Sequence, residues 1–275
     1  MKLKDLNKAA SLFNSTEKMP VLFLGHGSPM NAIEENEFVA GFRSIGKEIS
    51  KPNAILCISA HWETNGTYVT AMQSPRTIHD FGGFPKELFD VQYPAQGDPE
   101  LAKKTKDLVS KIEIGLDEQW GLDHGAWSVI KHMYPDADVP VIQLSLDRNK
   151  PPQYHYDLAR ELHSLRKQGV LIIGSGNIVH NLRKVAWDKL DIVDYAYDWA
   201  KEASSKIKSS IVNGDHDDLI NYQSNGTEYK LAIPTPEHYL PLLYVLALQD
   251  KKDNLTIFND KAVGGSLTMT SIKIS

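Results

Sequence analysis

The chain has 275 residues, 41% of them hydrophobic, and a formal net charge of −5 at pH 7. This length and composition favour a single globular domain, and the acidic balance excludes a basic surface for nucleic acid or an anionic membrane. No run approaches the roughly 20 apolar residues of a membrane span, and the N-terminus lacks a secretory signal, so we expect a cytoplasmic protein that acts on small molecules.

Short apolar runs, rich in branched residues and bounded by Gly, Pro, Asn or Ser, predict buried strands. Segments with helical spacing of apolar residues lie between them. In chain order, we expect strand 20–24, helix 36–50, strand 54–59, helices 99–112 and 125–133, strand 139–146, helix 153–168, strand 170–173 and helix 194–209.

The last part of the chain has a different pattern. Residues 213–226 are polar and predict a surface loop, while 255–258 and 266–274 predict two further strands, placed at an edge or antiparallel. Alternation of strands and helices in the rest of the chain predicts a largely parallel sheet covered on both faces. The expected fold is therefore a single-domain, three-layer α/β/α structure with a mostly parallel, mixed central sheet.

Three histidines follow predicted strands. His26 comes directly after the first strand and His61 directly after the second, while His180 lies a few residues beyond the fourth. Between that strand and His180, residues 174–177 (Gly-Ser-Gly-Asn) predict a tight turn. Loops at the carboxyl ends of strands converge in an open α/β sheet, so these imidazoles are expected to meet in one crevice.

A fourth histidine, His238, lies where the sequence predicts the start of a helix. Thr235 is the expected N-cap and Pro236 the first helical residue, followed by an apolar stretch up to residue 248. The positive end of the helix dipole would then disfavour protonation of His238, and a metal requires the neutral imidazole.

A single histidine after a strand usually has a structural role, but this combination of positions predicts a metal site. We consider His26, His61 and His238 the best candidate ligands. No pair with the spacing His-x-x-x-His is present to fix local geometry. His124 and His79 lie in glycine-containing segments that can line the same site.

Six spaced motifs extend this argument, and all of them occur in one order along the chain. Together they resemble the 4,5-DOPA dioxygenase extradiol family, which belongs to the class III extradiol ring-cleaving dioxygenases. The motifs are LGHGSPM (24–30), SAHW (59–62), TIHDFGGFP (77–85), DHG (123–125), SGNIVHN (175–181) and PTPEHY (234–239). The resemblance implies a catalytic domain over residues 19–275, preceded by an N-terminal extension over residues 1–18.

The resemblance also implies roles for particular residues. His26, His61 and His238 would bind one non-haem divalent metal, although the wider superfamily uses a glutamate as third ligand and Glu237 is adjacent. His180 would be the catalytic base or a fourth metal ligand. His124 would be a nearby catalytic acid or base. Fe(II) is expected for activity, because zinc cannot pass electrons between substrate and O2. Zn(II) is the other ion that a purified sample could contain.

The implied reaction is the opening of a catechol ring, such as that of L-DOPA, by O2. One alternative is a zinc-dependent, amidase-like hydrolase that uses Glu237 as general base. A second alternative is a catalytically silent binding protein on the same fold. The expected partners are a small aromatic substrate and O2, and the chain is expected to be a monomer or a small homo-oligomer.

Overall fold

The structure is a computed structural model that describes residues 18–275. Apart from Lys18, the predicted N-terminal extension lies outside the described residues, so this boundary stays a prediction. Among residues 18–275, no helix is long and apolar enough to cross a membrane.

Over the described residues, eight strands form the central sheet, in the order β4-β3-β5-β2-β6-β1-β10-β7. Four pairs of neighbouring strands are parallel: β1 with β6, β6 with β2, β2 with β5, and β3 with β4. Three pairs are antiparallel: β1 with β10, β10 with β7, and β3 with β5. The sheet strands are β1 Val21–Gly25, β2 Ala54–Thr64, β3 Thr67–Thr70, β4 Ile114–Asp117, β5 Val141–Asp147, β6 Val170–Gly176, β7 Leu255–Phe258 and β10 Ser271–Ile274. A separate short pair consists of β8 Ala262–Val263 and β9 Leu267–Thr268.

Helices connect and cover the strands. Several begin at a side-chain cap: Asn36 accepts a hydrogen bond from the backbone N–H of Val39, and Asp123 accepts one from that of Ala126. The α-helices are α2 Glu37–Glu48, α3 Lys86–Phe89, α4 Pro99–Leu108, α5 His124–Met133, α6 Pro152–Glu161, α7 Asp198–Asn213, α8 His216–Ile220, α9 Thr227–Ala232 and α10 Leu240–Ala247. Short 3-10 helices are η1 Pro29–Ala32, η2 His163–Gln168, η3 Leu182–Lys184, η4 Trp187–Lys189 and η5 Tyr222–Ser224.

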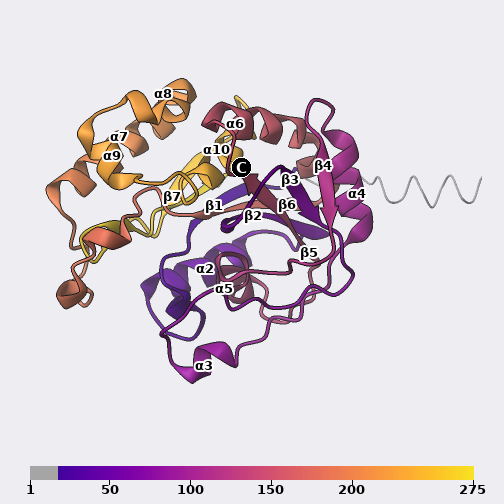
Figure 1. The fold of residues 1–275 in the computed structure, drawn as a ribbon, viewed down its shortest axis with the longest axis horizontal. Helices are drawn as coiled ribbons and strands as arrows, with labels where there is room; N and C mark the ends of the chain where they lie inside the picture. Colours follow the sequence, from indigo (N-terminus) through magenta and orange to yellow (C-terminus); the bar gives the residue numbers. More distant parts are fainter. Residues whose placement is uncertain (1–17) are drawn as a thin grey trace, which may run out of the picture.

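The helices form a layer on each side of the sheet. Figure 1 shows α2 and α5 on one side and α6 and α10 on the other. Alternate residues of each buried strand supply the two apolar cores: Leu22 and Cys57 pack with α2 and α5, while Phe23 and Leu56 belong to the core that contains α6 and α10. This arrangement confirms the predicted three-layer fold with a mostly parallel, mixed sheet.

The structure corrects several of the predicted elements. Strand β2 continues to Thr64 through a register shift between Ile58 and Glu63, so His61 lies within the strand rather than after it. The expected turn at 174–177 is mostly strand, because β6 extends to Gly176. The predicted loop 213–226 contains α8 and η5.

The strands β3 and β4 were not expected from the sequence. Their sequences, TYVT and IGLD, lack the continuous apolar run that marks the predicted strands. The predicted helix start at Thr235 is also wrong, since α10 begins at Leu240. Of the two C-terminal strands, β7 forms an edge and β10 lies between β7 and β1, both in antiparallel pairings as predicted.

Candidate metal centre

The histidines of interest meet at one end of the sheet. His26 directly follows β1, and its backbone N–H bonds to the carbonyl of Gly176 at the end of β6. His61 projects from the irregular end of β2. His238 lies in the turn before α10, and its carbonyl accepts a hydrogen bond from Asn177, just beyond β6.

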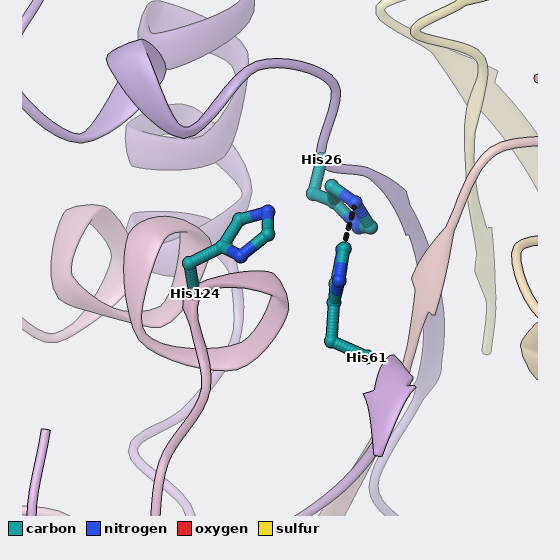
Figure 2. Close-up of side chains that lie close together, drawn as sticks. All are labelled: His26, His61 and His124. Carbon is teal, nitrogen blue, oxygen red and sulfur yellow. Dashed lines mark hydrogen bonds between the residues drawn. The ribbon is translucent and has the colours of Figure 1, made fainter. Parts of the chain in front are cut away.

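Three of the histidine rings lie at nearly equal distances from one another. The ring centroids of His26 and His61 are 5.0 Å apart, those of His61 and His238 5.0 Å, and those of His26 and His238 5.2 Å. The Nε2 atoms of His26 and His61 lie 3.1 Å apart, and the dashed line in Figure 2 marks this contact. The three histidines that the sequence singled out therefore lie around one common point.

Two other histidines adjoin this group. His124, in the first turn of α5, faces the pair in Figure 2, and its ring centroid is 3.9 Å from that of His61 and 5.7 Å from that of His26. The ring of His180 stacks on that of His238 at 3.5 Å with an interplanar angle of 7°. His26, His61, His124, His180 and His238 are thus brought together. His79 is not part of this group, because its Nε2 contacts the carbonyl of Val91 at 2.9 Å and its ring lies against Phe81 and Trp127.

Ligand atoms that could hold a metal fall into two sets, and within each set they lie within 4.8 Å of one another. One set is His26, His61 and His124, and the other is His180, Glu237 and His238. The predicted trio is divided between these sets. The proximity of ligand atoms therefore allows more than one set of metal ligands. The distances between the ring centroids distinguish these sets.

The groups that lie beside each Nδ1 atom indicate which nitrogen of each ring carries the proton. The hydroxyl of Ser175 donates to the carbonyl of Gly125, so its oxygen accepts from Nδ1 of His26 at 3.0 Å. Nδ1 of His61 lies 3.4 Å from a carboxylate oxygen of Asp80. The Nε2 contact between His26 and His61 is a hydrogen bond only if one of the two rings is protonated at Nε2. With both protons on Nδ1, two Nε2 lone pairs face each other, an arrangement that a cation stabilises.

The remaining rings follow the same rule. Nδ1 of His238 lies 3.2 Å from a carboxylate oxygen of Glu237, which also accepts from the Thr235 hydroxyl. Nδ1 of His124 lies 2.9 Å from Asp80. A carboxylate only accepts hydrogen bonds, so Nδ1 is the donor in both rings, and the neutral form of each ring has its lone pair on Nε2.

Two glycines let the site assemble. A side chain at Gly176 would place Cβ 2.1 Å from the carbonyl oxygen of His238, so only glycine lets the end of β6 approach that turn. At Gly125, a Cβ would lie 2.5 Å from the Ser59 hydroxyl and 2.8 Å from the His61 ring. Larger residues at these positions would displace His238 or His61.

The site favours neutral imidazoles. Burial, reinforced by neighbouring histidines, holds the pKa values of His26 and His238 well below 6.5. Burial and the nearby His124 lower the pKa of His61 to about 3. Burial lowers the pKa of His180 to about 4, against the opposing effect of Glu237. The low pKa of His238 therefore has a different cause from the predicted helix dipole, because α10 starts two residues later.

Sequence reasoning did not identify the groups that orient the rings. Asp80 lies in one of the quoted motifs, but its role was missed because the segment 71–85 contains no helix or strand that would predict its direction. Ser175 was placed in a turn. Of the aromatic residues near the histidines, Phe81 contacts His124 at 5.5 Å between centroids, whereas the Trp127 and Tyr239 side chains are buried and bond to backbone carbonyls.

These buried neutral histidines predict that acid destabilises the metal-free protein. An unfolded histidine has a pKa near 6.5, so below that pH the unfolded chain binds more protons and the free energy of unfolding falls as pH decreases. At pH 5, the loss is about 2 kcal/mol for each of His61 and His180. Urea unfolding of chelator-treated protein at pH 7.5 and pH 5 measures it.

The variant H180Q provides the control for this measurement. Because glutamine does not titrate, H180Q is expected to lose less stability than the wild type between the same two pH values. Equal losses in both proteins would show that His180 is not a buried neutral group.

Fold and site together define a class: an α/β protein with a histidine-lined centre, able to hold a metal ion, at the carboxyl ends of parallel strands. The family model described as the catalytic LigB subunit of aromatic ring-opening dioxygenase matches residues 20–268. The chain belongs to this family of aromatic ring-opening dioxygenases, and it is an extradiol dioxygenase enzyme.

Similar proteins cover nearly the whole chain. A 4,5-DOPA dioxygenase extradiol from Escherichia coli K12 is 46% identical over 266 residues, which is 94% of this chain and 96% of that protein. One from Beta vulgaris is 35% identical over 259 residues, covering 92% of this chain and 95% of its own length. A crystal structure of an uncharacterized Escherichia coli K12 protein superposes with a TM-score of 0.81 at 41% identity, over 94% of this chain and 100% of that one.

Proposed function

We propose that this enzyme is a metal-dependent extradiol dioxygenase that opens a catechol ring with O2, and that His26, His61 and His238 hold one divalent ion. The observation that carries the proposal is the near-equal spacing of the three rings. Imidazoles that bind one ion at about 2.1 Å have centroids about 3.2 Å from it, and hence about 4.5 to 5.2 Å apart for angles of about 90° to 109°. The three separations, 5.0, 5.0 and 5.2 Å, meet this condition.

The same condition argues against the other candidate ligands. The ring centroid of His124 is 3.9 Å from that of His61 and 5.7 Å from that of His26. One distance is shorter and the other longer than the range expected for rings that bind one ion, so His124 does not fit this ligand set. A metal lies in the plane of the imidazole that binds it. Because the His180 and His238 rings are nearly parallel and stacked, their planes share no point near both rings, so we assign His180 as a base rather than a ligand.

The chemistry that such an ion supplies is chelation of the two catechol oxygens and electron transfer between the ring and O2. His26, His61 and His238 would hold this ion, and as only three protein ligands they would leave it accessible to both substrates. Neutral His180 can accept a phenolic proton. Neutral His124 can do the same at Nε2, because its protonated Nδ1 donates a hydrogen bond to Asp80.

L-DOPA is the substrate we propose, because the name of the relatives from Escherichia coli and Beta vulgaris contains it. The match covers 96% of the Escherichia coli protein and 95% of the Beta vulgaris protein, and the six motifs all lie within residues 20–268, which the family model matches. Phe81, whose ring contacts His124, provides an apolar surface beside the site that suits a flat aromatic substrate.

Neither alternative function has comparable support. An amidase-like hydrolase needs a carboxylate directed at the metal-bound water as general base, but Oε1 of Glu237 instead contacts Nδ1 of His238 and the Thr235 hydroxyl. A silent binding protein has no need for a cluster of neutral histidines. Both readings also differ from the ring-opening activity of the family.

The test of this proposal compares the protein loaded with Fe(II) and with Zn(II). Anaerobic reconstitution of chelator-treated protein with Fe(II), followed by L-DOPA and air, is expected to give O2 uptake and a yellow ring-opened product. The Zn(II)-loaded protein is expected to give neither, since zinc is redox-inert. Oxygen electrode traces and absorbance spectra measure both. Absence of O2 uptake by the Fe(II) protein with every catechol tested would contradict the proposal.

A further inference from the structure

A single carboxylate, Asp80, contacts two of the site histidines. Its Oδ2 atom lies 2.9 Å from Nδ1 of His124 and 3.4 Å from Nδ1 of His61. We propose that Asp80 is a positioning residue that fixes the ring tautomers of the metal ligand and of the proton acceptor together. This inference rests on the proposed function, in which His61 binds the ion and His124 accepts a proton.

The position of Asp80 is itself fixed by the backbone. Its other oxygen, Oδ1, accepts a hydrogen bond of 2.8 Å from the backbone N–H of His124, in the first turn of α5. The side chain of Asp80 is only 17% exposed. The carboxylate therefore has one oxygen bound to the helix start and the other directed at both imidazoles, which leaves little freedom to rotate.

The chemical consequence follows from what a carboxylate can do. It offers no hydrogen, so each Nδ1 that faces it carries a proton, and in the neutral imidazole Nε2 keeps its lone pair. For His61, Nε2 lies 3.1 Å from Nε2 of His26, where the ion is proposed. For His124, the lone pair is free to take a substrate proton. One residue thus prepares both metal binding and proton transfer.

The near-isosteric variant D80N tests this role. The amide oxygen can replace Oδ1 toward the helix, but the NH2 group then faces both rings and forces them to accept at Nδ1. The Nε2 protons that result compete with the metal. We expect a Zn(II) dissociation constant about 10- to 100-fold higher than in the wild type, measured by competition with a chelating dye.

The ring tautomers give a readout that does not depend on activity. In the metal-free wild type at pH 7.5, nitrogen-15 NMR with selective histidine labelling is expected to show His61 and His124 protonated at Nδ1. In D80N both signals are expected to move to the Nε2-protonated form. The matched control is D90N, whose carboxylate pairs with Lys86 at the surface and lies outside the site. Its tautomers and its Zn(II) affinity should equal those of the wild type.

A second variant separates the two branches of the contact. In H124A the carboxylate still faces His61, so Zn(II) affinity is expected to stay within about threefold of the wild type. Adding D80N to H124A is expected to lower the affinity by the same factor as in the wild type, because the effect passes through His61.

Several outcomes decide between this inference and its failure. Wild-type tautomers and wild-type Zn(II) affinity in D80N would overturn it. If D80N does not fold, the wild-type spectrum still decides, because His61 protonated at Nε2 in the metal-free protein would contradict the role of Asp80. A wild type that binds no metal would instead refute the proposed function, whereas tight wild-type binding with an unaffected D80N refutes only this inference.

Discussion

Replacing His61 with alanine is expected to abolish ring cleavage and stoichiometric metal binding together. His61 supplies one of three nitrogens whose rings are equally spaced, and its Nε2 lies 3.1 Å from that of His26. Loss of residues that merely orient ligands already costs about 10- to 100-fold in metal affinity, so loss of a ligand should exceed 100-fold. Metal content after gel filtration and O2 uptake with L-DOPA measure the two effects.

The control for this variant is H163A. His163 lies in η2 and pairs with Asp250, away from the histidine cluster. Its metal content and O2 uptake should match the wild type. If H61A retained one equivalent of Fe(II) and normal turnover, then the proposed ligand set would be wrong.

Replacing His180 with alanine is expected to separate metal binding from catalysis. Because its ring is stacked parallel to that of His238, His180 cannot bind the same ion from its present position. H180A should therefore hold one Fe(II) with affinity close to that of the wild type. Its kcat should fall by about 10²- to 10⁴-fold, the usual contribution of a general base, with a much smaller change in KM.

The two measured quantities distinguish the roles left open for this residue. Loss of the metal in H180A would identify His180 as a ligand. Wild-type kcat would show that it is neither ligand nor base. Since burial lowers the pKa of His180 to about 4, the residue is neutral and able to accept a proton at pH 7.

The sequence predicts the framework of this protein well because its central strands are buried on both faces. Runs such as Leu22 to Leu24 are continuously apolar, bounded by turn residues, and too short for helices. Strand β3 escapes prediction because its sequence, TYVT, has no continuous apolar run. Likewise, the register shift in β2 depends on its pairing with β5, so the placement of His61 within the strand is a tertiary effect.

The candidate site follows the same division. Parallel strands direct their carboxyl ends to one edge of the sheet, so the meeting of His26 with His61 follows from the predicted topology. The contacts of Asp80 and Ser175 do not follow, because their direction depends on how loop 71–85 and strand β6 pack against α5. Sequence patterns predict the candidate ligands, whereas packing determines which groups contact their ring nitrogens.

X-ray absorption at the iron edge, combined with a crystal structure of the Fe(II) protein prepared without O2, tests the central claim most directly. The account predicts one ion, about 2.1 Å from Nε2 of His26, His61 and His238, with His180 unbound. An ion bound instead through His124, or ions bound separately at the two ends of the cluster, would contradict it.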